Sequence, residues 1–181
     1  FEASIDLASM SKTSTKVFVL EVMGRNAGWL AASTALAPKP YNADIILMPE
    51  RAFNQKATFE KIQSTVATKG YCSIAVAEGL KNDKKNIWSL QKENIDAFGH
   101  TQLGGVGSQL SQLIQKELKL KTHFAIADYL QRSARHIASK VDSDESFALG
   151  QEAIKFCKAR KSGKMLTIER LCNHPYRSRI K

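Results

Sequence analysis

The sequence is short of cysteine and of long apolar runs, and each shortage excludes a class of protein. Its three cysteines are an odd number without C-x-x-C spacing, which argues against a disulfide framework and a zinc knuckle and favours a reducing, cytoplasmic setting. The composition excludes a membrane span, and the amino end lacks the charged and apolar stretches of a signal peptide. With 43% hydrophobic and 24% charged residues over 181 positions, the chain is typical of a globular domain rather than a disordered or collagen-like one.

Acidic residues are also few: the chain has 27 basic and 17 acidic side chains, which gives a net charge of +10. A nucleic-acid-binding protein would gather its basic residues with aromatic ones, but here they are spread along the chain. No helix-turn-helix or RNP pattern is present either. We therefore interpret most of these residues as solvated helix faces and expect neither nucleic acid nor a membrane as a partner. The positive field also suits an anionic, phosphorylated substrate.

Short apolar runs alternate with segments of helical periodicity, which predicts an α/β layered fold with a mostly parallel sheet flanked by helices. We expect strands over residues 16–23, 44–49, 72–77, 123–127 and 165–169. We expect helices over residues 26–37, 58–69, 108–118, 133–141 and 143–160. The first of these helices is expected to be well covered, and Asp142 with Glu145 is expected to cap the last one. Residues 81–102 are predicted to form a polar excursion that Trp88 anchors.

Three segments follow expected strands, at the carboxyl edge of a parallel sheet, where ligands bind. They are residues 23–25, 78–79 and 128–132. If Arg25, Arg132 and Glu78 converge there, they suit a phosphorylated polyol, because guanidinium groups bind phosphate and a carboxylate accepts hydrogen bonds from hydroxyls. Taken singly, each residue also has a plainer interpretation, as a surface arginine or a charge at a strand end.

Other glycine and histidine patterns are less specific. Residues 104–107 (GGVG) precede a helix and predict either an anion-binding nest or a tight turn. Residues 162–164 (SGK) do not form a Walker A motif, because Lys158 stands where its first glycine is required. The four histidines lack metal-ligand spacing, so no zinc site is expected.

Residues 21–29 (EVMGRNAGW) resemble the E-V-M-G-R-x-A-G segment in the sugar-phosphate domain of the 6-phosphofructokinase family. Three further segments agree with that family in order: residues 77–79 (AEG), 129–132 (YLQR) and 163–165 (GKM). The resemblance covers nearly the whole chain. Trp29, the glycines of residues 104–107 and the sequence QRS at 131–133 are more similar to the pyrophosphate-dependent branch than to the bacterial ATP-dependent one.

The resemblance implies transfer of a phosphoryl group, with magnesium, to the 1-hydroxyl of fructose 6-phosphate, which gives fructose 1,6-bisphosphate in glycolysis. It implies a pocket lined by Met23, Gly24 and Arg25, in which Glu78 accepts hydrogen bonds from sugar hydroxyls. Tyr129, where ATP-dependent relatives have a histidine, would hold the 6-phosphate together with Arg132.

Two further positions are implied to act between subunits of a homodimer or tetramer. Lys16 and His123 fall where relatives often have arginines that reach the 6-phosphate of a neighbouring subunit. Lys16 keeps the positive charge, whereas His123 departs from the pattern and puts the strength of that contact in doubt.

The family's G-G-D or G-G-G donor loop and its T-I-D-N-D segment, which supplies the aspartate base and holds the metal, have no match here. In relatives these segments lie upstream, and this chain starts at Phe1 rather than Met. We therefore expect the C-terminal half of a phosphofructokinase, incomplete without an N-terminal donor domain. The catalytic base and the Mg²⁺ ligands would lie upstream, and no catalytic residue is expected in this chain.

The expected domains are a fructose 6-phosphate-binding domain over residues 1–130, helices over 131–164 that cross to the donor domain, and a strand and tail over 165–181. The expected partners are fructose 6-phosphate and, through the missing half, pyrophosphate. Two alternatives stay open: ATP as the donor, and a non-catalytic subunit that senses a sugar phosphate.

Overall fold

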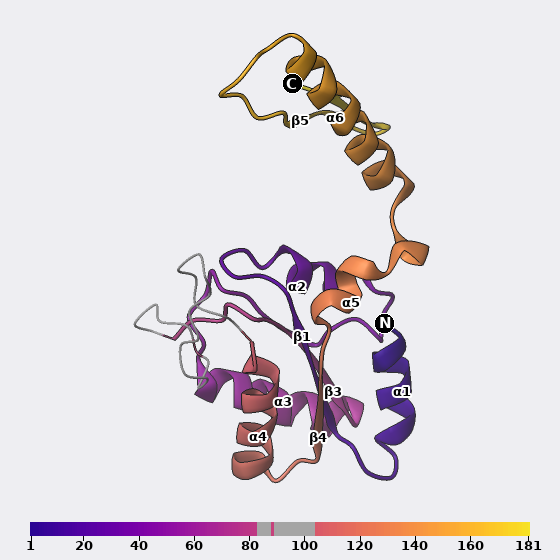
Figure 1. Cartoon of the computed structure of the whole chain (residues 1–181). Coiled ribbons are helices and arrows are strands. Elements are labelled where there is room, and N and C mark those ends of the chain that lie inside the picture. Colours follow the sequence, from indigo (N-terminus) through magenta and orange to yellow (C-terminus); the bar gives the residue numbers. More distant parts are fainter. Residues whose placement is uncertain (83–87, 89–103) are drawn as a thin grey trace. The chain divides into compact units, whose positions relative to one another are not determined.

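The computed structural model describes residues 1–82, 88 and 104–181. The chain divides into two compact units, Phe1–Gln131 and Arg132–Lys181. Figure 1 labels most of the helices and strands of these units.

Among the described residues of the first unit, four parallel strands form one sheet in the order β2-β3-β1-β4. The strands are β1 (Val17–Val22), β2 (Ile45–Leu47), β3 (Cys72–Ala77) and β4 (Thr122–Ile126). Glu21 on β1 lies opposite Val76 on β3 and Ile126 on β4. The carboxyl ends of these three strands therefore meet at one edge of the sheet, and the predicted α/β fold is confirmed.

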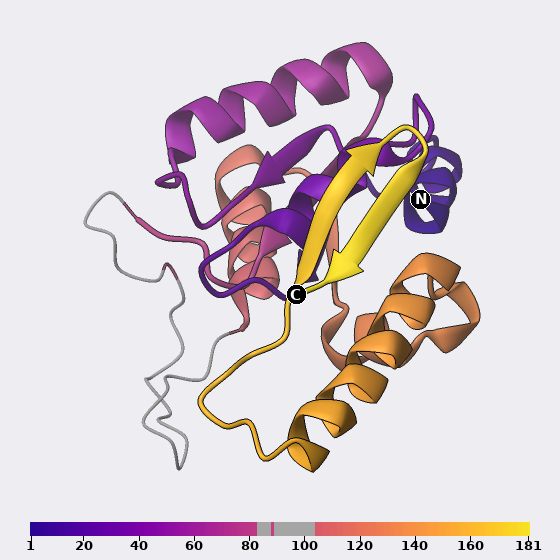
Figure 2. The same ribbon diagram turned by 90° about the horizontal axis from the view of Figure 1, so that it is seen from above.

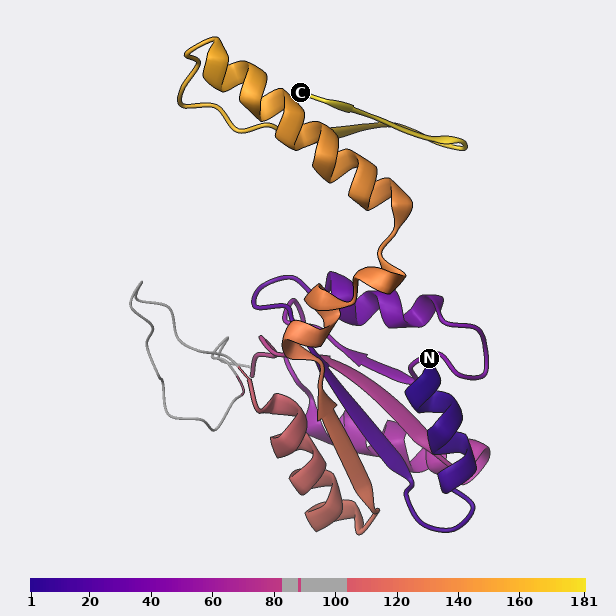
Figure 3. The ribbon, with the colours of Figure 1, turned by 45° about the vertical axis from the view of Figure 1, so that its right-hand side comes forward.

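Helices cover both faces of this sheet; Figure 3 shows α4 and α1 on opposite sides of it. The helices are α1 (Glu2–Met10), α2 (Trp29–Ser33) with the 3₁₀ turn η1 (Thr34–Leu36), α3 (Gln55–Lys69) and α4 (Val106–Leu118). Val17 and Val19 face the main core together with Ile62 of α3 and Leu110 of α4. Successive side chains of a strand point to opposite faces, so Phe18 lies on the other face, beside Ser4 of α1.

The central strand and the long helices form where the sequence pattern places them. β3 is buried along its whole length, as expected for an apolar strand between two neighbours. The side chain of Asn54 begins α3 by accepting a hydrogen bond from the amide of Ala57 at 3.0 Å, and Gly70 ends it with φ of 88°. Trp88 packs its ring 4.6 Å from that of Phe53, so it anchors its part of the chain as predicted. The rest of the predicted excursion at 83–103 lies outside the described residues.

In the first unit one element was missed, and the helix expected over residues 26–37 differs from its prediction in length and in coverage. Helix α1 was not predicted. The expected helix begins only at Trp29 and ends in the turn η1, and just before it the amide of Gly28 donates to Glu50 Oε1 at 2.7 Å. That helix is also poorly covered: Ala31 is buried, but the side chains of Trp29 and Leu36 are 82% and 86% exposed.

The second unit contains helix α6 and an antiparallel hairpin, both visible in Figure 2. Its elements are η2 (Arg135–Ile137), α6 (Lys140–Lys158), β5 (Ile168–Asn173) and β6 (Tyr176–Ile180), preceded by the short helix α5 (Asp128–Ser133) that begins in the first unit. The carboxylate of Glu145 joins helix to hairpin by accepting hydrogen bonds from the hydroxyls of Tyr176, at 2.6 Å, and Ser178. Among the described helices of the chain, none is long and apolar enough to cross a membrane.

The predictions for this region need correction. The helix expected over 133–141 is instead the end of α5 followed by η2. Helix α6 begins earlier than expected, because the side chain of Ser139 accepts from the amide of Asp142, so Asp142 and Glu145 are not its capping pair. The strand predicted over 165–169 begins at Ile168, and the expected tail folds back as β6.

Candidate functional site

A cavity of about 240 Å³ opens at the carboxyl ends of β1, β3 and β4. Met23, Glu78 and Asp128 line this cavity, so the structure brings together the three segments that the sequence placed at this edge. The complete lining comprises Glu21, Val22, Met23, Glu78, Gly104, Gly105, Ile126 and Asp128. Three of these residues carry carboxylates, which gives the cavity strong hydrogen-bond acceptors.

The backbone after β1 is held against the end of β3. The amide of Gly24 donates to Glu78 Oε1 at 3.1 Å, and the amide of Gly79 donates to the carbonyl oxygen of Gly24 at 3.1 Å. A Cβ atom on Gly79 would lie 1.9 Å from the carbonyl oxygen of Arg25, so no residue with a side chain fits there without moving the backbone. Glycine thus allows the close approach of the backbone of Arg25, a half-buried residue, to Gly79.

Glu21 is a buried carboxylate in the wall of the cavity, with a side chain only 1% exposed. Its Oε1 accepts from the amide of Gly105 at 3.1 Å, and its Oε2 accepts from the amide of Gly107 at 2.7 Å. Burial raises the pKa of Glu21 above its ordinary value, the two amides oppose that shift, and the carboxylates of Glu78 and Asp128 add to it.

The segment of residues 104–107 therefore shows both features that the sequence predicted as alternatives, a tight turn and an anion-binding nest. Its residues make a tight turn, with φ of 80° at Gly105, and their amides bind an anion, which is the chain's own Glu21. Sequence reasoning did not single out Glu21 as a site residue. A signal was present, because Glu21 is an acidic residue inside the apolar strand of residues 17–22, and such a residue requires a buried partner.

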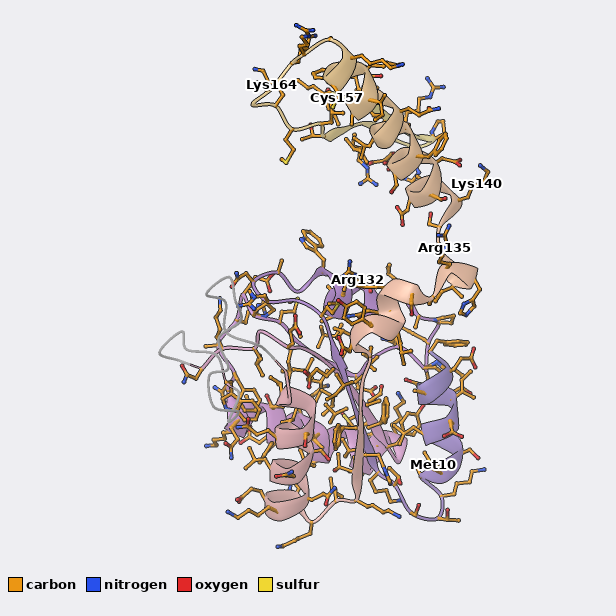
Figure 4. The ribbon with its side chains drawn as sticks, in the orientation of Figure 1. Met10, Arg132, Arg135, Lys140, Cys157 and Lys164 are labelled. Carbon is orange, nitrogen blue, oxygen red and sulfur yellow. The ribbon has the colours of Figure 1, made fainter. Side chains whose placement is uncertain are left out.

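The positions of Tyr129 and Arg132 follow from α5. Tyr129 comes directly after the cavity residue Asp128, and its side chain is 66% exposed. Arg132 is on the same short helix but belongs to the second unit, so its contact with the cavity stays a prediction. Figure 4 labels Arg132 on α5 and Arg135 on η2.

Lys16 and His123 lie at the other edge of the sheet. The amide of Lys16 donates to the carbonyl oxygen of Lys121 at 2.9 Å, just before β1, and His123 pairs with Phe18 near the start of β4. Strand β1 alone, at ~3.3 Å per residue, places about 20 Å between Lys16 and the cavity. The structure therefore does not bring these two residues into the cavity of their own chain, and their role toward a neighbouring subunit stays a prediction.

The carboxylates of the cavity do not fit a magnesium site. Within the part of the chain that the structure describes, no three His, Cys, Asp or Glu side chains gather as potential metal ligands. Both oxygens of Glu21 already accept hydrogen bonds from backbone amides. No step is therefore assigned to a metal held by these residues.

The sequence profile of the family described as Phosphofructokinase matches residues 2–157 of this chain. The chain belongs to the phosphofructokinase family. Among curated phosphofructokinases, the pyrophosphate–fructose 6-phosphate 1-phosphotransferase of Halomonas elongata is 45% identical over 97% of this chain and 42% of its own length. The enzyme of the same name from Xanthomonas campestris is 44% identical over 99% of this chain and 43% of its own length.

Solved phosphofructokinase structures agree as well. The crystal structure of the pyrophosphate-dependent phosphofructokinase from Nitrosospira multiformis matches with a TM-score of 0.80 at 43% identity, over 99% of this chain and 42% of that one. The resemblance to the pyrophosphate-dependent branch is thus confirmed. The chain spans about 42% of the length of these phosphofructokinases.

Proposed function

We propose that the first unit binds fructose 6-phosphate as the phosphoryl acceptor of a pyrophosphate-dependent phosphofructokinase. The observation that carries this proposal is the cavity at the carboxyl edge, where Glu78 and Asp128 offer carboxylates to sugar hydroxyls. Arg25, in the loop after β1, and Arg132 would hold the 6-phosphate with Tyr129. Relatives that are over 40% identical to this chain across the aligned residues carry that activity in their names.

In this proposal the chain supplies binding and orientation of the acceptor. The 1-hydroxyl oxygen of the sugar forms a bond to a phosphorus atom of pyrophosphate, the bond to the bridging oxygen breaks, and inorganic phosphate leaves. The hydroxyl proton passes to a base that we expect outside this chain. Phosphoryl transfer depends mainly on positioning and on electrostatic stabilisation, so an acceptor pocket of fixed shape is a substantial share of the catalyst.

Residues 131–164 are proposed to pack on the donor half. Apolar side chains that would suit such a contact are exposed on α6 and η2: Phe147 is 70%, Ile154 57% and Ile137 76% exposed. An apolar surface of this kind is typical of a contact with another part of a protein.

The proposal is tested by isothermal titration calorimetry of the chain with fructose 6-phosphate, with fructose and inorganic phosphate as comparison ligands. We expect fructose 6-phosphate to bind more tightly than either. Glu78→Gln should raise its dissociation constant about tenfold, because the sugar hydroxyl then donates to a neutral amide oxygen in place of a charged carboxylate. The matched control is Glu152→Gln, which removes a partly exposed carboxylate that pairs with Lys155 on α6. Equal binding of fructose 6-phosphate and inorganic phosphate would contradict the proposal.

Arg132→Ala measures whether the second unit contributes to phosphate binding. We expect a loss of about 1.5–3 kcal/mol of binding free energy, the scale of a hydrogen bond to a charged group. Arg135→Ala, on the neighbouring η2, is the control. If Arg132→Ala leaves the affinity unchanged, Arg132 is a surface residue.

The donor and the sensing alternative are distinguished by activity. In a chain extended to the length of the relatives, transfer from pyrophosphate but not ATP would support the proposal. Transfer from ATP alone would identify an ATP-dependent enzyme, and sugar binding without transfer from either donor would identify a sensing subunit.

A further inference from the structure

Glu21 makes buried hydrogen bonds to which the proposed reaction assigns no role. It lies at the carboxyl end of β1, two residues before Met23, yet its oxygens accept from the amides of Gly105 and Gly107, more than 80 positions along the chain. A buried carboxylate requires such donors, since an unpaired charge away from water is strongly unfavourable.

The turn is shaped to receive this carboxylate. A Cβ atom on Gly107 would lie 3.1 Å from the Cβ of Glu21 and 3.2 Å from its Oε2, closer than side chains ordinarily pack. Glycine at 107 therefore leaves the room in which Oε2 reaches the amide at 2.7 Å. The first residues of α4 are fixed to β1 at this point, because the turn leads directly into that helix.

The contact also determines the shape of the cavity. Gly104 and Gly105 line one side of it, and Met23 and Glu78 line the same cavity from the ends of β1 and β3. Glu21 joins these sides, because it belongs to β1 and holds the turn that carries Gly105. Its two oxygens are directed to backbone amides rather than left to a ligand.

We propose that Glu21 is a positioning residue, which holds the turn of residues 104–107 as one wall of the cavity and thereby sets the affinity for the sugar phosphate. This inference rests on the proposed function, because it assigns the wall to the fructose 6-phosphate pocket. It predicts that loss of the Glu21 charge weakens sugar-phosphate binding in a protein that is still folded.

The test is Glu21→Gln, a change of nearly the same shape. A glutamine side chain has one acceptor oxygen and one donor group, so it faces one of the two amides with a donor. We expect the dissociation constant for fructose 6-phosphate, measured by calorimetry on the folded chain, to rise about tenfold. Hydrogen exchange at the amides of Gly105 and Gly107 should accelerate in the same variant.

A matched control separates positioning from general loss of stability. Asp44 is another largely buried carboxylate that accepts from a backbone amide, that of Ser73 at 2.8 Å, but it lies at the amino end of the sheet. Asp44→Asn should lower the unfolding midpoint in urea and leave the dissociation constant within twofold of wild type. A merely structural role for Glu21 would make the two variants behave alike.

A second pair of variants applies if Glu21→Gln does not fold. Gly107→Ala keeps the charge but pushes a methyl group against the carboxylate, and we expect a rise in the dissociation constant of about threefold or more. Gly150→Ala, at a helical position with open space around it, should leave the affinity unchanged.

The outcomes are distinct. Weaker binding in Glu21→Gln or Gly107→Ala, with both controls unaffected, supports the inference. Wild-type affinity in a folded Glu21→Gln, or in Gly107→Ala where only that variant folds, overturns it while the proposed function stands. Failure of the wild-type chain to bind fructose 6-phosphate overturns the proposed function and the inference together.

Discussion

Gly79 shows how strongly a single residue constrains this site. A Cβ atom there would lie 1.9 Å from one backbone oxygen and 2.7 Å from another, those of Arg25 and Gly24, and neither can rotate away as a side chain does. We expect Gly79→Ala to lower the free energy of unfolding by at least about 2 kcal/mol. Urea denaturation measures this, with Gly150→Ala as the control. Equal midpoints for Gly79→Ala and wild type would show that the two strand ends are not in close contact.

The three cysteines differ in environment and should differ in reactivity. Cys72 is buried in β3, and burial raises the pKa of its thiol to about 12, whereas Cys157 and Cys172 are exposed. Because the thiolate is the reactive form, a maleimide at neutral pH should label two cysteines in the native chain and three after denaturation. Mass spectrometry counts the labels. Rapid native labelling of Cys72 would be inconsistent with its burial.

At the residue scale, the sequence predicted the part of the site that follows from strand order. Met23, Glu78 and Asp128 could be expected together because each follows a strand of a parallel sheet. The partners of Glu21 could not be predicted, since nothing local indicates which amides, 84 and 86 positions away, its carboxylate meets.

At the scale of elements, the predictions succeeded where burial leaves a pattern in the sequence. Strand β3 has the predicted bounds because it is buried throughout and apolar at every position except Ser73. Helix α1 was missed, since only Ser4 and Leu7 are buried in it and its apolar periodicity is weak. The hairpin was missed for a related reason: most of its residues are exposed, so strand pairing rather than a core stabilises it.

The amino end of α3 allows the contribution of a helix cap to the free energy of unfolding to be measured. Asn54→Ala removes the side-chain oxygen that accepts from the amide of Ala57 at 3.0 Å. We expect a loss of about 1 kcal/mol in the free energy of unfolding, and Asn54→Ser should retain most of the stability because serine also caps helices. Chemical denaturation compares the two variants. If both are equally stable, the cap does not contribute.

The contact between α6 and the hairpin should depend on pH. Hydrogen bonds from Ser178 and Tyr176 lower the pKa of Glu145, so the ionised carboxylate favours the folded arrangement. This stabilisation is present above the ordinary glutamate pKa and is lost as the pH falls through the lowered value. Amide exchange of β6 should therefore accelerate in acid.

The variant Glu145→Gln tests that assignment. It should make exchange of β6 amides less dependent on pH over the same range, since glutamine does not titrate. Glu152→Gln on the same helix is the control and should keep the wild-type dependence. A wild-type pH profile in Glu145→Gln would assign the effect to another group.

At the scale of the whole molecule, the proposed function gives the chain one side of a two-sided reaction, the binding of the phosphoryl acceptor. The cavity carries acceptors for a polyol, and the described residues do not form a metal site. The chain spans about 42% of the length of its relatives. The resemblance of the sequence predicted this family, which is confirmed, and an acceptor role that stays a prediction.

Binding of fructose 6-phosphate to the cavity is tested most directly by titrating the isotope-labelled chain with this sugar phosphate. Two-dimensional NMR of the backbone amides monitors the titration. We expect saturable shifts concentrated at Met23, Gly24, Glu78, Gly105 and Asp128, and smaller shifts with inorganic phosphate. Saturable shifts that avoid these residues, or an unchanged spectrum at millimolar sugar phosphate, would contradict the claim that this cavity binds the phosphoryl acceptor.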